Sequence, residues 1–149
     1  MTTTFRYKTK GAFTLIELII VMAIIAILAS LVLAAAGSVQ KKGARSRTEA
    51  EIKAVEDALE SYKSDNGDYP SNSSSGSATL LTALMPTTGT KVYFEFKSKY
   101  TNAQGWIDPF GLNYNYIYTN GAPNNGTNNY DLWSTAGGST NTNTWIKNW

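Results

Sequence analysis

Residues 10–37, KGAFTLIELIIVMAIIAILASLVLAAAG, decide the fold because they form one long apolar run. From Ala12 to Ala36 the only ionisable side chain is that of Glu17. Twenty-five residues of α-helix span about 37 Å, which exceeds the roughly 30 Å hydrocarbon core of a bilayer. The run therefore predicts a helix that crosses a membrane. It also raises a question, because a carboxylate inside a membrane is unfavourable unless a cation pairs with it.

Three interpretations of this run remain open on its residues. A secretory signal peptide would be cut near Ala34-Ala35-Ala36, but the run is about twice the usual length and contains Glu17. A plain membrane anchor leaves Glu17 unexplained, and basic residues flank the run on both sides without orienting it. These are Arg6, Lys8 and Lys10 before the run and Lys41, Lys42, Arg45 and Arg47 after it. The third interpretation gives Glu17 a function, which is the default for an ionisable residue inside a membrane.

The composition excludes several kinds of activity. The 149 residues contain no Cys and no His, which removes thiol chemistry, disulfides and His-based acid–base catalysis. The sequence has no Gly-rich phosphate loop and no nucleophile placed beside a base, so we expect no enzyme activity. The small excess of basic residues comes from the segment before the apolar run. From residue 13 onward the sequence contains ten basic and eleven acidic side chains. Nucleic-acid binding is therefore not expected, since it needs a basic surface.

The helical pattern continues beyond the apolar run. Ile52, Val55, Leu59 and Tyr62 recur at helical spacing and predict one buried stripe, which Ala54 and Ala58 would widen; these six residues are the predicted stripe. Asn66-Gly67 and Pro70 are typical of a helix end. We therefore expect one helix from Phe13 to Ser64.

The C-terminal part is rich in aromatic and Asn residues and predicts a small sheet. Residues 71–77, SNSSSGS, are typical of a flexible link, and residues 78–85 predict a short helix. Residues 91–97, 113–119 and 129–135 alternate in hydrophobicity, which predicts three strands. A sheet this small is marginal alone and must cover the helical stripe. The expected fold class is α+β: a long N-terminal helix packed on a small antiparallel sheet.

The order Phe13, Thr14, Leu15, Ile16, Glu17 before an apolar run resembles the processing motif of the type IV pilin and pseudopilin superfamily. The resemblance implies that a prepilin peptidase removes a short basic leader and that the new N-terminal residue is methylated. Gly11 is followed by Ala12, whereas the family usually has Gly directly before the cut bond. We favour cleavage between Ala12 and Phe13, since Glu17 then becomes the fifth mature residue, as in the family; cleavage after Gly11 would make it the sixth.

Further segments resemble the major pseudopilins of type II secretion systems. These are ALESYKSDNGDYP (58–70), DPFGLNYNY (108–116), YDLWS (130–134) and the terminal NW (148–149), while residues 87–105 look like an insertion. In that family the loop before the C-terminus holds Ca²⁺. Here the loop from Thr135 to Lys147 has no Asp or Glu, and Asn141, Asn143 and backbone carbonyls offer neutral oxygens only. We therefore expect no metal and no other cofactor, with the loop held by Trp145, Ile146 and Asn/Thr hydrogen bonds.

The resemblance implies four regions: a leader (1–12), a transmembrane and filament-core helix (13–36), an amphipathic helix (37–64) and a β-rich C-terminal domain (65–149). It implies a homo-oligomeric filament that supports protein export across the outer membrane. The chain would sit in the bacterial inner membrane with a single pass, and its C-terminal domain would lie in the periplasm. Implied partners are prepilin peptidase, an inner-membrane assembly platform and minor pseudopilins. Glu17 would meet the amine of Phe13 on a neighbouring subunit.

Two alternatives follow from the same residues. Within the superfamily, the chain would be a type IV pilin or a competence pseudopilin, serving adhesion, motility or DNA uptake. In a different class, it would be a secreted or anchored aromatic-rich binding module, since Tyr, Trp and Asn side chains bind sugars. The density of aromatic residues is better explained by a small domain without Cys that needs large side chains to fill its core.

The N-terminus of the mature chain separates these classes. We expect mass spectrometry of the chain isolated from membranes to find an N-methylated Phe13 as the first residue. A mature chain that begins at Gly37 would instead support a signal peptide and a secreted module.

Overall fold

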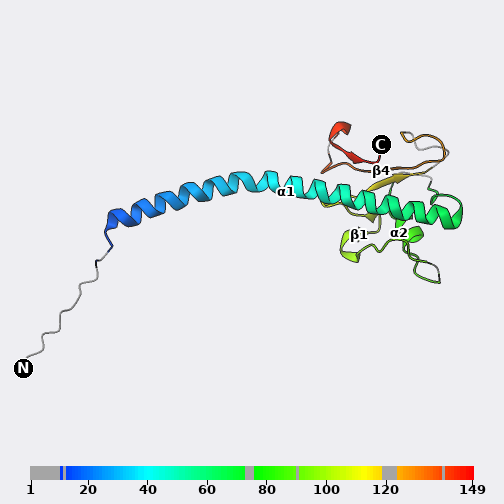
Figure 1. Cartoon of the computed structure of the whole chain (residues 1–149), viewed down its shortest axis with the longest axis horizontal. Coiled ribbons are helices and arrows are strands. Elements are labelled where there is room, and N and C mark those ends of the chain that lie inside the picture. The colour runs from blue at the N-terminus through cyan, green and yellow to red at the C-terminus, as the bar shows by residue number, and fades with distance from the viewer. Residues whose placement is uncertain (1–10, 12, 73–75, 90, 119–123, 139) are drawn as a thin grey trace, which may run out of the picture. The chain divides into compact units, whose positions relative to one another are not determined.

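The computed structural model describes residues 11, 13–72, 76–89, 91–118, 124–138 and 140–149, with the backbone alone described at 34–36. The chain divides into two compact units, Met1–Gln40 and Lys41–Trp149. Helix α1 (Leu15–Asn66) contributes its first half to one unit and its second half to the other (Figure 1). The predicted α+β fold is confirmed, because this long helix is accompanied by small antiparallel sheets.

The first unit contains the N-terminal half of α1, which is apolar on every side. Its large apolar side chains between Leu15 and Leu33 are all at least half exposed, from 50% at Ile20 to 76% at Leu15. A helix that is apolar all round is stable only inside a protein core or a lipid bilayer. Among the described residues, α1 is the one helix long and apolar enough to cross a membrane.

The second unit contains the C-terminal half of α1 and all the remaining elements. They are α2 (Ala78–Leu84), the 3₁₀ turns η1 (Ser98–Tyr100) and η2 (Thr142–Thr144), β1 (Thr101–Asn102), β2 (Gly105–Trp106), β3 (Asn115–Ile117), β4 (Asp131–Ser134) and β5 (Ile146–Lys147). Strands β1 and β2 form one antiparallel pair, and β3-β4-β5 form a three-stranded antiparallel sheet. Within this unit the β4 sheet lies on one side of α1, and α2 and β1 lie on the other (Figure 1).

The predicted stripe of α1 is buried in the core of the second unit. Ile52, Val55 and Leu59 are at most 4% exposed, Ala58 is buried, and Tyr62 is half-buried. The prediction was wrong for Ala54, which is exposed. At 100° per residue, Ala54 lies about 120° from the centre of the stripe, so the covering elements do not reach it.

Strands β3 and β4 confirm two of the predicted strands and supply the other side of this core. Tyr114 and Tyr116 are fully buried on one face, as their alternation predicted, and Tyr116 pairs with the buried Leu132 of β4. The same core cluster also contains Leu80 and Leu84 of α2. The sheet therefore covers the helical stripe with large aromatic side chains.

The predicted strand at residues 91–97 is wrong, because this segment pairs with no strand in the described part of the chain. Its backbone turns to α2 instead: the N–H groups of Tyr93 and Phe94 both donate to the carbonyl of Leu84, at 2.8 and 3.2 Å. The predicted alternation of buried and exposed side chains holds only in part: Phe96 is buried, but Val92, which should share its face, is 51% exposed. The segment is an irregular cover held by the C-terminal end of α2.

The predicted flexible link at residues 71–77 is wrong at the residues described there. The Asn72 amide donates to the Tyr116 carbonyl at 2.6 Å and accepts from the Tyr118 N–H at 2.7 Å. Ser77 is fully buried, and its hydroxyl accepts from the Trp106 N–H at 2.8 Å. The Asn72 side chain thus replaces a missing ladder partner at the free edge of β3, an edge that proteins commonly cover, whereas Ser77 binds β2.

Two glycines are required by the backbone around this link. Gly67 ends α1 with a positive φ of 87°, and its N–H donates to the Lys63 carbonyl at 2.7 Å. Gly105 has a φ of 134°, and a Cβ there would lie 2.4 Å from the Ser77 hydroxyl and 2.7 Å from the Ala78 nitrogen. The contact between β2 and the start of α2 therefore needs a residue without a side chain.

We expect Gly105→Ala to lower the free energy of unfolding by about 2 kcal/mol or more, because it adds a backbone clash to the strain of positive φ. Gly67→Ala is the matched control: its φ is also positive, but its Cβ would meet nothing within 4 Å. Urea unfolding followed by tryptophan fluorescence measures both variants. Equal losses in the two would show that the contact with Ser77 does not constrain the fold.

Candidate functional site

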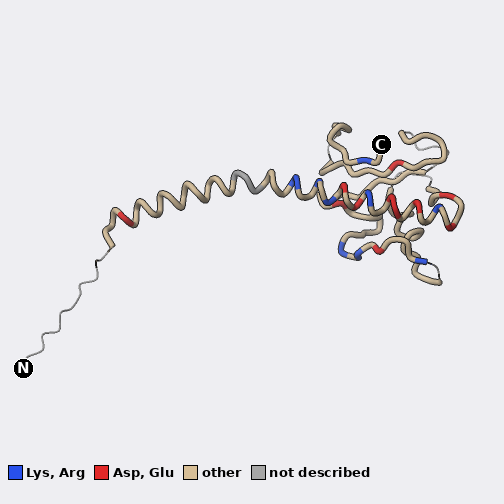
Figure 2. Tube along the Cα trace, in the orientation of Figure 1, with Lys and Arg blue, Asp and Glu red and all other residues tan. Residues whose placement is uncertain are grey.

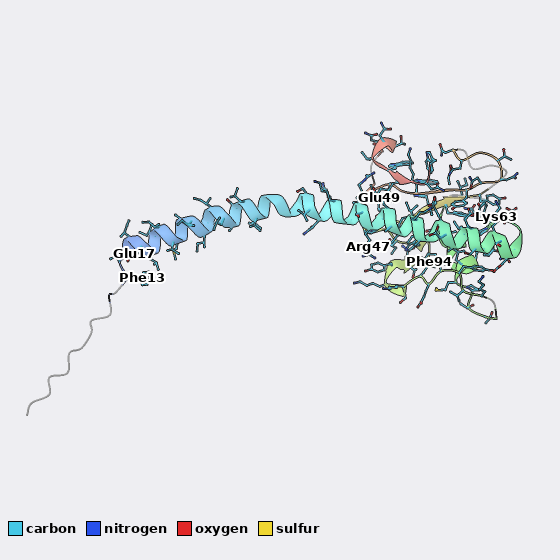
Figure 3. All side chains as sticks on the ribbon, viewed as in Figure 1. Phe13, Glu17, Arg47, Glu49, Lys63 and Phe94 are labelled. Carbon is cyan, nitrogen blue, oxygen red and sulfur yellow. The ribbon has the colours of Figure 1, made fainter. Side chains whose placement is uncertain are left out.

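Phe13 and Glu17 lie together at the start of α1 (Figure 3). Phe13 is 83% exposed and precedes the helix, which begins at Leu15. Gly11 is described and exposed, whereas Ala12 lies outside the described residues. The predicted cleavage between Ala12 and Phe13 therefore stays a prediction, with Phe13 accessible on a non-helical stretch of chain.

Thr14 and Glu17 form a capping box at the start of α1. The Glu17 carboxylate oxygen Oε2 accepts from the Thr14 N–H at 2.9 Å and from the Thr14 hydroxyl at 2.8 Å. In return the Thr14 Oγ1 accepts from the Glu17 N–H at 3.3 Å. This reciprocal arrangement satisfies N–H groups that the first helical turn leaves unpaired. It also places a negative charge at the positive end of the helix dipole.

The capping box uses only one side of the carboxylate. Both bonds to Glu17 end on Oε2, and no described residue donates to Oε1. Glu17 itself is exposed in this chain. The carboxylate is therefore held in a fixed position by its own helix while one oxygen remains available to a cation from outside.

The apolar half of α1 is the largest uncovered apolar surface among the described residues. Figure 3 shows side chains projecting outward along this part of the helix, and in the sequence Glu17 is the one charged residue between positions 11 and 40; Figure 2 shows the described part of this half as tan apart from one acidic position near its start. The exposed large side chains here are Leu15, Ile16, Leu18, Ile19, Ile20, Val21, Met22, Ile24, Ile25, Ile27, Leu28, Leu31, Val32 and Leu33. A surface of this size marks a membrane or protein contact.

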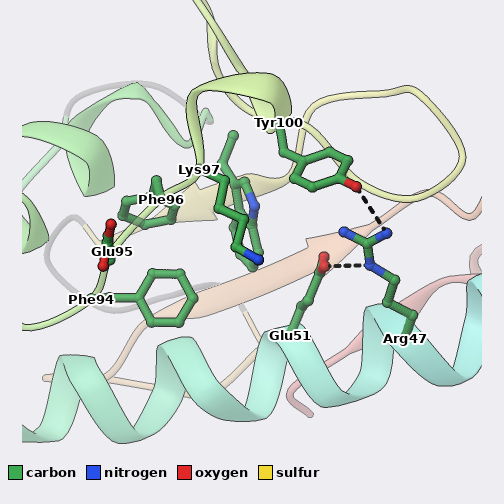
Figure 4. Close-up of a pocket in the computed structure, with 8 residues that line it drawn as sticks. Arg47, Glu51, Phe94, Glu95, Phe96, Lys97 and Tyr100 are labelled. Atoms are coloured by element: carbon green, nitrogen blue, oxygen red, sulfur yellow. Dashed lines mark hydrogen bonds and ion pairs between the residues drawn. The ribbon is translucent and has the colours of Figure 1, made fainter.

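A polar network anchors α1 to the rest of the second unit. The Arg47 Nε donates to Glu51 Oε1 at 2.7 Å, and its NH1 donates to the Tyr100 hydroxyl at 3.4 Å (Figure 4). The other oxygen of Glu51 accepts from the Tyr114 hydroxyl at 2.8 Å. The Arg47 guanidinium also lies 4.4 Å above the Tyr100 ring, a favourable cation–π position. Three segments distant in sequence therefore meet at the Arg47–Glu51 pair.

The electrostatics of this network keep its donors protonated. Burial raises the pKa of Tyr114, and the hydrogen bond to the Glu51 carboxylate raises it further. The hydrogen bond from Arg47 lowers the pKa of Tyr100 and raises the pKa of the guanidinium itself. Tyr114 thus remains a hydrogen-bond donor to Glu51 at neutral pH.

An open pocket of about 390 Å³ lies beside this network (Figure 4). It is lined by Arg47, Glu51, Phe94, Glu95, Phe96, Lys97, Tyr100 and Trp106. Both oxygens of Glu51 already accept hydrogen bonds, so this carboxylate is not placed to act as a base. Among the described residues no three His, Cys, Asp or Glu side chains are grouped to hold a metal.

The C-terminal loop from Thr135 to Lys147 has the internal contacts that the sequence predicted. The Asn141 side chain accepts from the Asn143 N–H at 3.0 Å, and the Thr144 hydroxyl donates to the Asn141 carbonyl at 2.7 Å. Ile146 is buried, and the Trp145 ring stacks on the Trp133 ring with centroids 6.1 Å apart. The loop is thus organised by neutral groups.

The acidic residues that flank this loop are engaged elsewhere. Asp108 accepts from the Phe110 and Leu112 N–H groups and from the Ser134 hydroxyl. Asp131 accepts from the Asn124 and Asn125 N–H groups and from the Asn124 side chain. Ca²⁺ needs six to eight oxygens with carboxylates among them. The donor set of the loop, with neutral oxygens only, does not fit a calcium ion, and the expected absence of a metal stays a prediction.

Sequence reasoning identified Phe13 and Glu17 but missed Thr14, Arg45 and Glu51. The signal for Thr14 was present, because Thr-x-x-Glu directly before an apolar run is a capping-box pattern. Arg45 and Glu51 carried no such signal. Their partners, Thr144 and Tyr114, are 99 and 63 residues away in sequence, and only the folded chain brings them together.

Comparison with known proteins gives consistent matches to one family. A family model described as Type II secretion system (T2SS), protein G, matches residues 36–149, and one described as Prokaryotic N-terminal methylation motif matches residues 7–33. Proteins named Type II secretion system core protein G from several bacteria are similar to this chain. The one from Klebsiella michiganensis is 30% identical over 117 residues, which is 75% of this chain and 76% of that protein.

Two further relatives carry the same name. The protein from Pectobacterium carotovorum subsp. carotovorum is 33% identical over 116 residues, which is 74% of this chain and 68% of that protein. The protein from Escherichia coli K12 is 31% identical over 112 residues, which is 72% of this chain and 70% of that protein. No solved structure matches the chain significantly.

We expect Thr14→Val to loosen the first turn of α1, because it removes the hydroxyl that bonds Glu17 in both directions. Loss of such a cap costs about 1 kcal/mol, which corresponds to an approximately fivefold faster amide exchange at residues 15–18. Hydrogen–deuterium exchange of the full chain in detergent micelles measures this. Thr14→Ser keeps the hydroxyl and serves as the control. Unchanged exchange in Thr14→Val would contradict a capping role.

Proposed function

This chain belongs to the type II secretion system protein G family, and from that premise we propose that it polymerises through α1 into a filament that supports protein export. The family is one of non-enzymatic pseudopilins, and the chain is a structural subunit of the secretion machinery. Its apolar N-terminal helix and methylation motif are consistent with anchoring in the inner membrane. The match to the protein G family distinguishes it from the type IV pilin and competence pseudopilins that the sequence left open.

The observation that carries the proposal is the uncovered apolar half of α1 with a single carboxylate at its start. Before assembly, lipid covers this surface. In the filament, the same surface packs against the helices of other copies, which removes it from water outside the membrane. The second unit keeps its own core and stays outside the membrane, on the periplasmic side.

Processing by prepilin peptidase between Ala12 and Phe13 completes the assembly site in this proposal. The cut removes the basic leader and leaves an amine on Phe13, which is then methylated and keeps its positive charge. No residue in the described part of the chain donates a hydrogen bond to Glu17 Oε1, so this oxygen can accept one from the Phe13 amine of a neighbouring subunit. Away from water this pair is strong, whereas an unpaired carboxylate in lipid is costly.

The remaining partners follow from the same proposal. An inner-membrane assembly platform would extract each subunit from the lipid, and minor pseudopilins would begin the filament. The homo-oligomer grows by addition of identical subunits, so the contact between Glu17 and Phe13 repeats along it. A repeated contact of this kind fixes the stagger between neighbours, as a buried polar residue fixes the register of a coiled coil.

We expect Glu17→Ala to be inserted and processed normally but to restore secretion poorly in a strain that lacks this chain. Loss of a pairing interaction of 1.4 kcal/mol per subunit already weakens each contact about tenfold, so filaments should become rare. Secreted proteins in the medium and in the periplasm, and filaments by electron microscopy, measure the effect. Asp57→Ala removes a carboxylate that is 74% exposed and should behave as the wild type. Normal filaments with Glu17→Ala would refute the proposed pairing, and normal secretion without the chain would refute the export function.

A further inference from the structure

Arg45 of α1 binds the C-terminal loop. The Arg45 NH1 donates to the backbone carbonyl of Thr144 at 2.9 Å, across 99 residues of sequence. Its Nε pairs with Glu49 Oε1 at 3.1 Å, one helical turn further along α1. Glu49 therefore holds the guanidinium in the direction that reaches the loop. Both contacts lie within the second unit, Lys41–Trp149.

The loop presents a formed structure to this arginine. Thr144 closes the 3₁₀ turn η2, where its N–H donates to the Asn141 carbonyl at 3.0 Å. Trp145 and Ile146 follow directly, and Ile146 pairs with Ser134 in the β4–β5 ladder. Arg45 therefore binds the loop at the point where the turn enters the sheet. A contact there restrains both the turn and the last strand.

Three tryptophans complete the restraint on the outer side of the sheet. The Trp133 and Trp145 rings are nearly parallel at 11°, and Trp149 meets Trp133 edge-on with centroids 5.8 Å apart. The Lys147 ammonium lies 5.0 Å from the centre of the Trp149 ring. Each such contact adds a modest stabilisation beyond the apolar area that it buries. The segment from Thr144 to Trp149 is therefore held by Arg45 at its start and by the tryptophan cluster along its length.

The Arg45 contact also opposes binding of a cation. A backbone carbonyl that accepts from a guanidinium faces a positive charge, and a metal ion at the same oxygen would be repelled by it. The loop contributes no carboxylate that would offset this repulsion. The buried carboxylates Asp108 and Asp131 are occupied by N–H and O–H donors. Arg45, held by Glu49, thus supplies an N–H donor to the Thr144 carbonyl, an oxygen that a metal ion would otherwise need.

We propose that the C-terminal loop of this protein is fixed by a metal-independent clip, in which Arg45 is the positioning residue and the Trp133, Trp145 and Trp149 cluster is the packing element. The folded unit then keeps its C-terminal loop in place when calcium is scarce. The inference concerns the folded chain and does not rest on filament assembly, so it stands or falls separately from the proposed function.

The test compares the full chain in detergent micelles with millimolar CaCl₂ and with millimolar EDTA, using thermal unfolding monitored by tryptophan fluorescence. We expect the same Tm in both conditions for the wild type. A rise in Tm of several degrees with CaCl₂ would overturn the proposal, whatever the variants do.

The variant Arg45→Gln tests the clip itself. We expect its Tm to fall by about 3–5 °C and cleavage in the loop by a nonspecific protease to become about fivefold faster. CaCl₂ should not restore either value. Lys42→Gln removes the same charge from an exposed position one turn earlier on α1 and should match the wild type. Arg45→Gln that behaves like Lys42→Gln would overturn the role of Arg45, and Arg45→Lys should recover part of the loss.

Discussion

Burial of one stripe of α1 under an aromatic sheet is the contact on which the rest of the folded unit depends. Val55 and Leu59 are fully buried against a core that includes Tyr114, Tyr116 and Leu132. The chain has no Cys, so large side chains must supply what disulfides supply in other small domains. Tyrosine suits this task because the ring fills volume while the hydroxyl reaches a polar partner. Among the described residues no buried side-chain nitrogen or oxygen lacks a hydrogen bond.

The tyrosine hydroxyls link this core to the segments around it. Tyr114 reaches Glu51 on α1, and Tyr116 reaches the Pro70 carbonyl just beyond the end of the helix. Two buried carboxylates do the same for the loops: Asp108 holds the turn at Phe110–Leu112, and Asp131 holds the start of the segment that leads into β4. A buried carboxylate is tolerated only when donors surround it, and here backbone N–H groups provide most of them. The acidic side chains therefore organise turns and are not available for other chemistry.

The success of sequence reasoning varied with the physical origin of each feature. Features with a periodic pattern of apolar residues were predictable, because that pattern depends only on neighbours in the sequence. They are the stripe at Ile52, Val55 and Leu59 and the strands at 115–117 and 131–134. The segment 91–97 alternates as a strand does, yet whether a strand forms depends on a neighbouring strand with free hydrogen bonds, and here α2 took that place. Ser77 was read as part of a polar link. Its burial depends on Gly105, whose missing side chain is a feature of a distant segment.

The candidate site shows the same division between features with a local sequence signal and features that depend on long-range contacts. Phe13 and Glu17 were predictable from a short motif, and so was Thr14, whereas the Arg45 clip depends on a contact across 99 residues. In lipid the apolar half of α1 has no hydrophobic reason to prefer one neighbouring helix or one stagger, since lipid tails are as apolar as its own side chains. Packing alone leaves the register of such helices poorly defined. In the proposed filament, the Glu17 carboxylate is fixed by its own capping box and has no described donor on Oε1, so it would supply a directional contact in this apolar surface. Its position at the first turn would place that contact beside the N-terminus that cleavage before Phe13 would create.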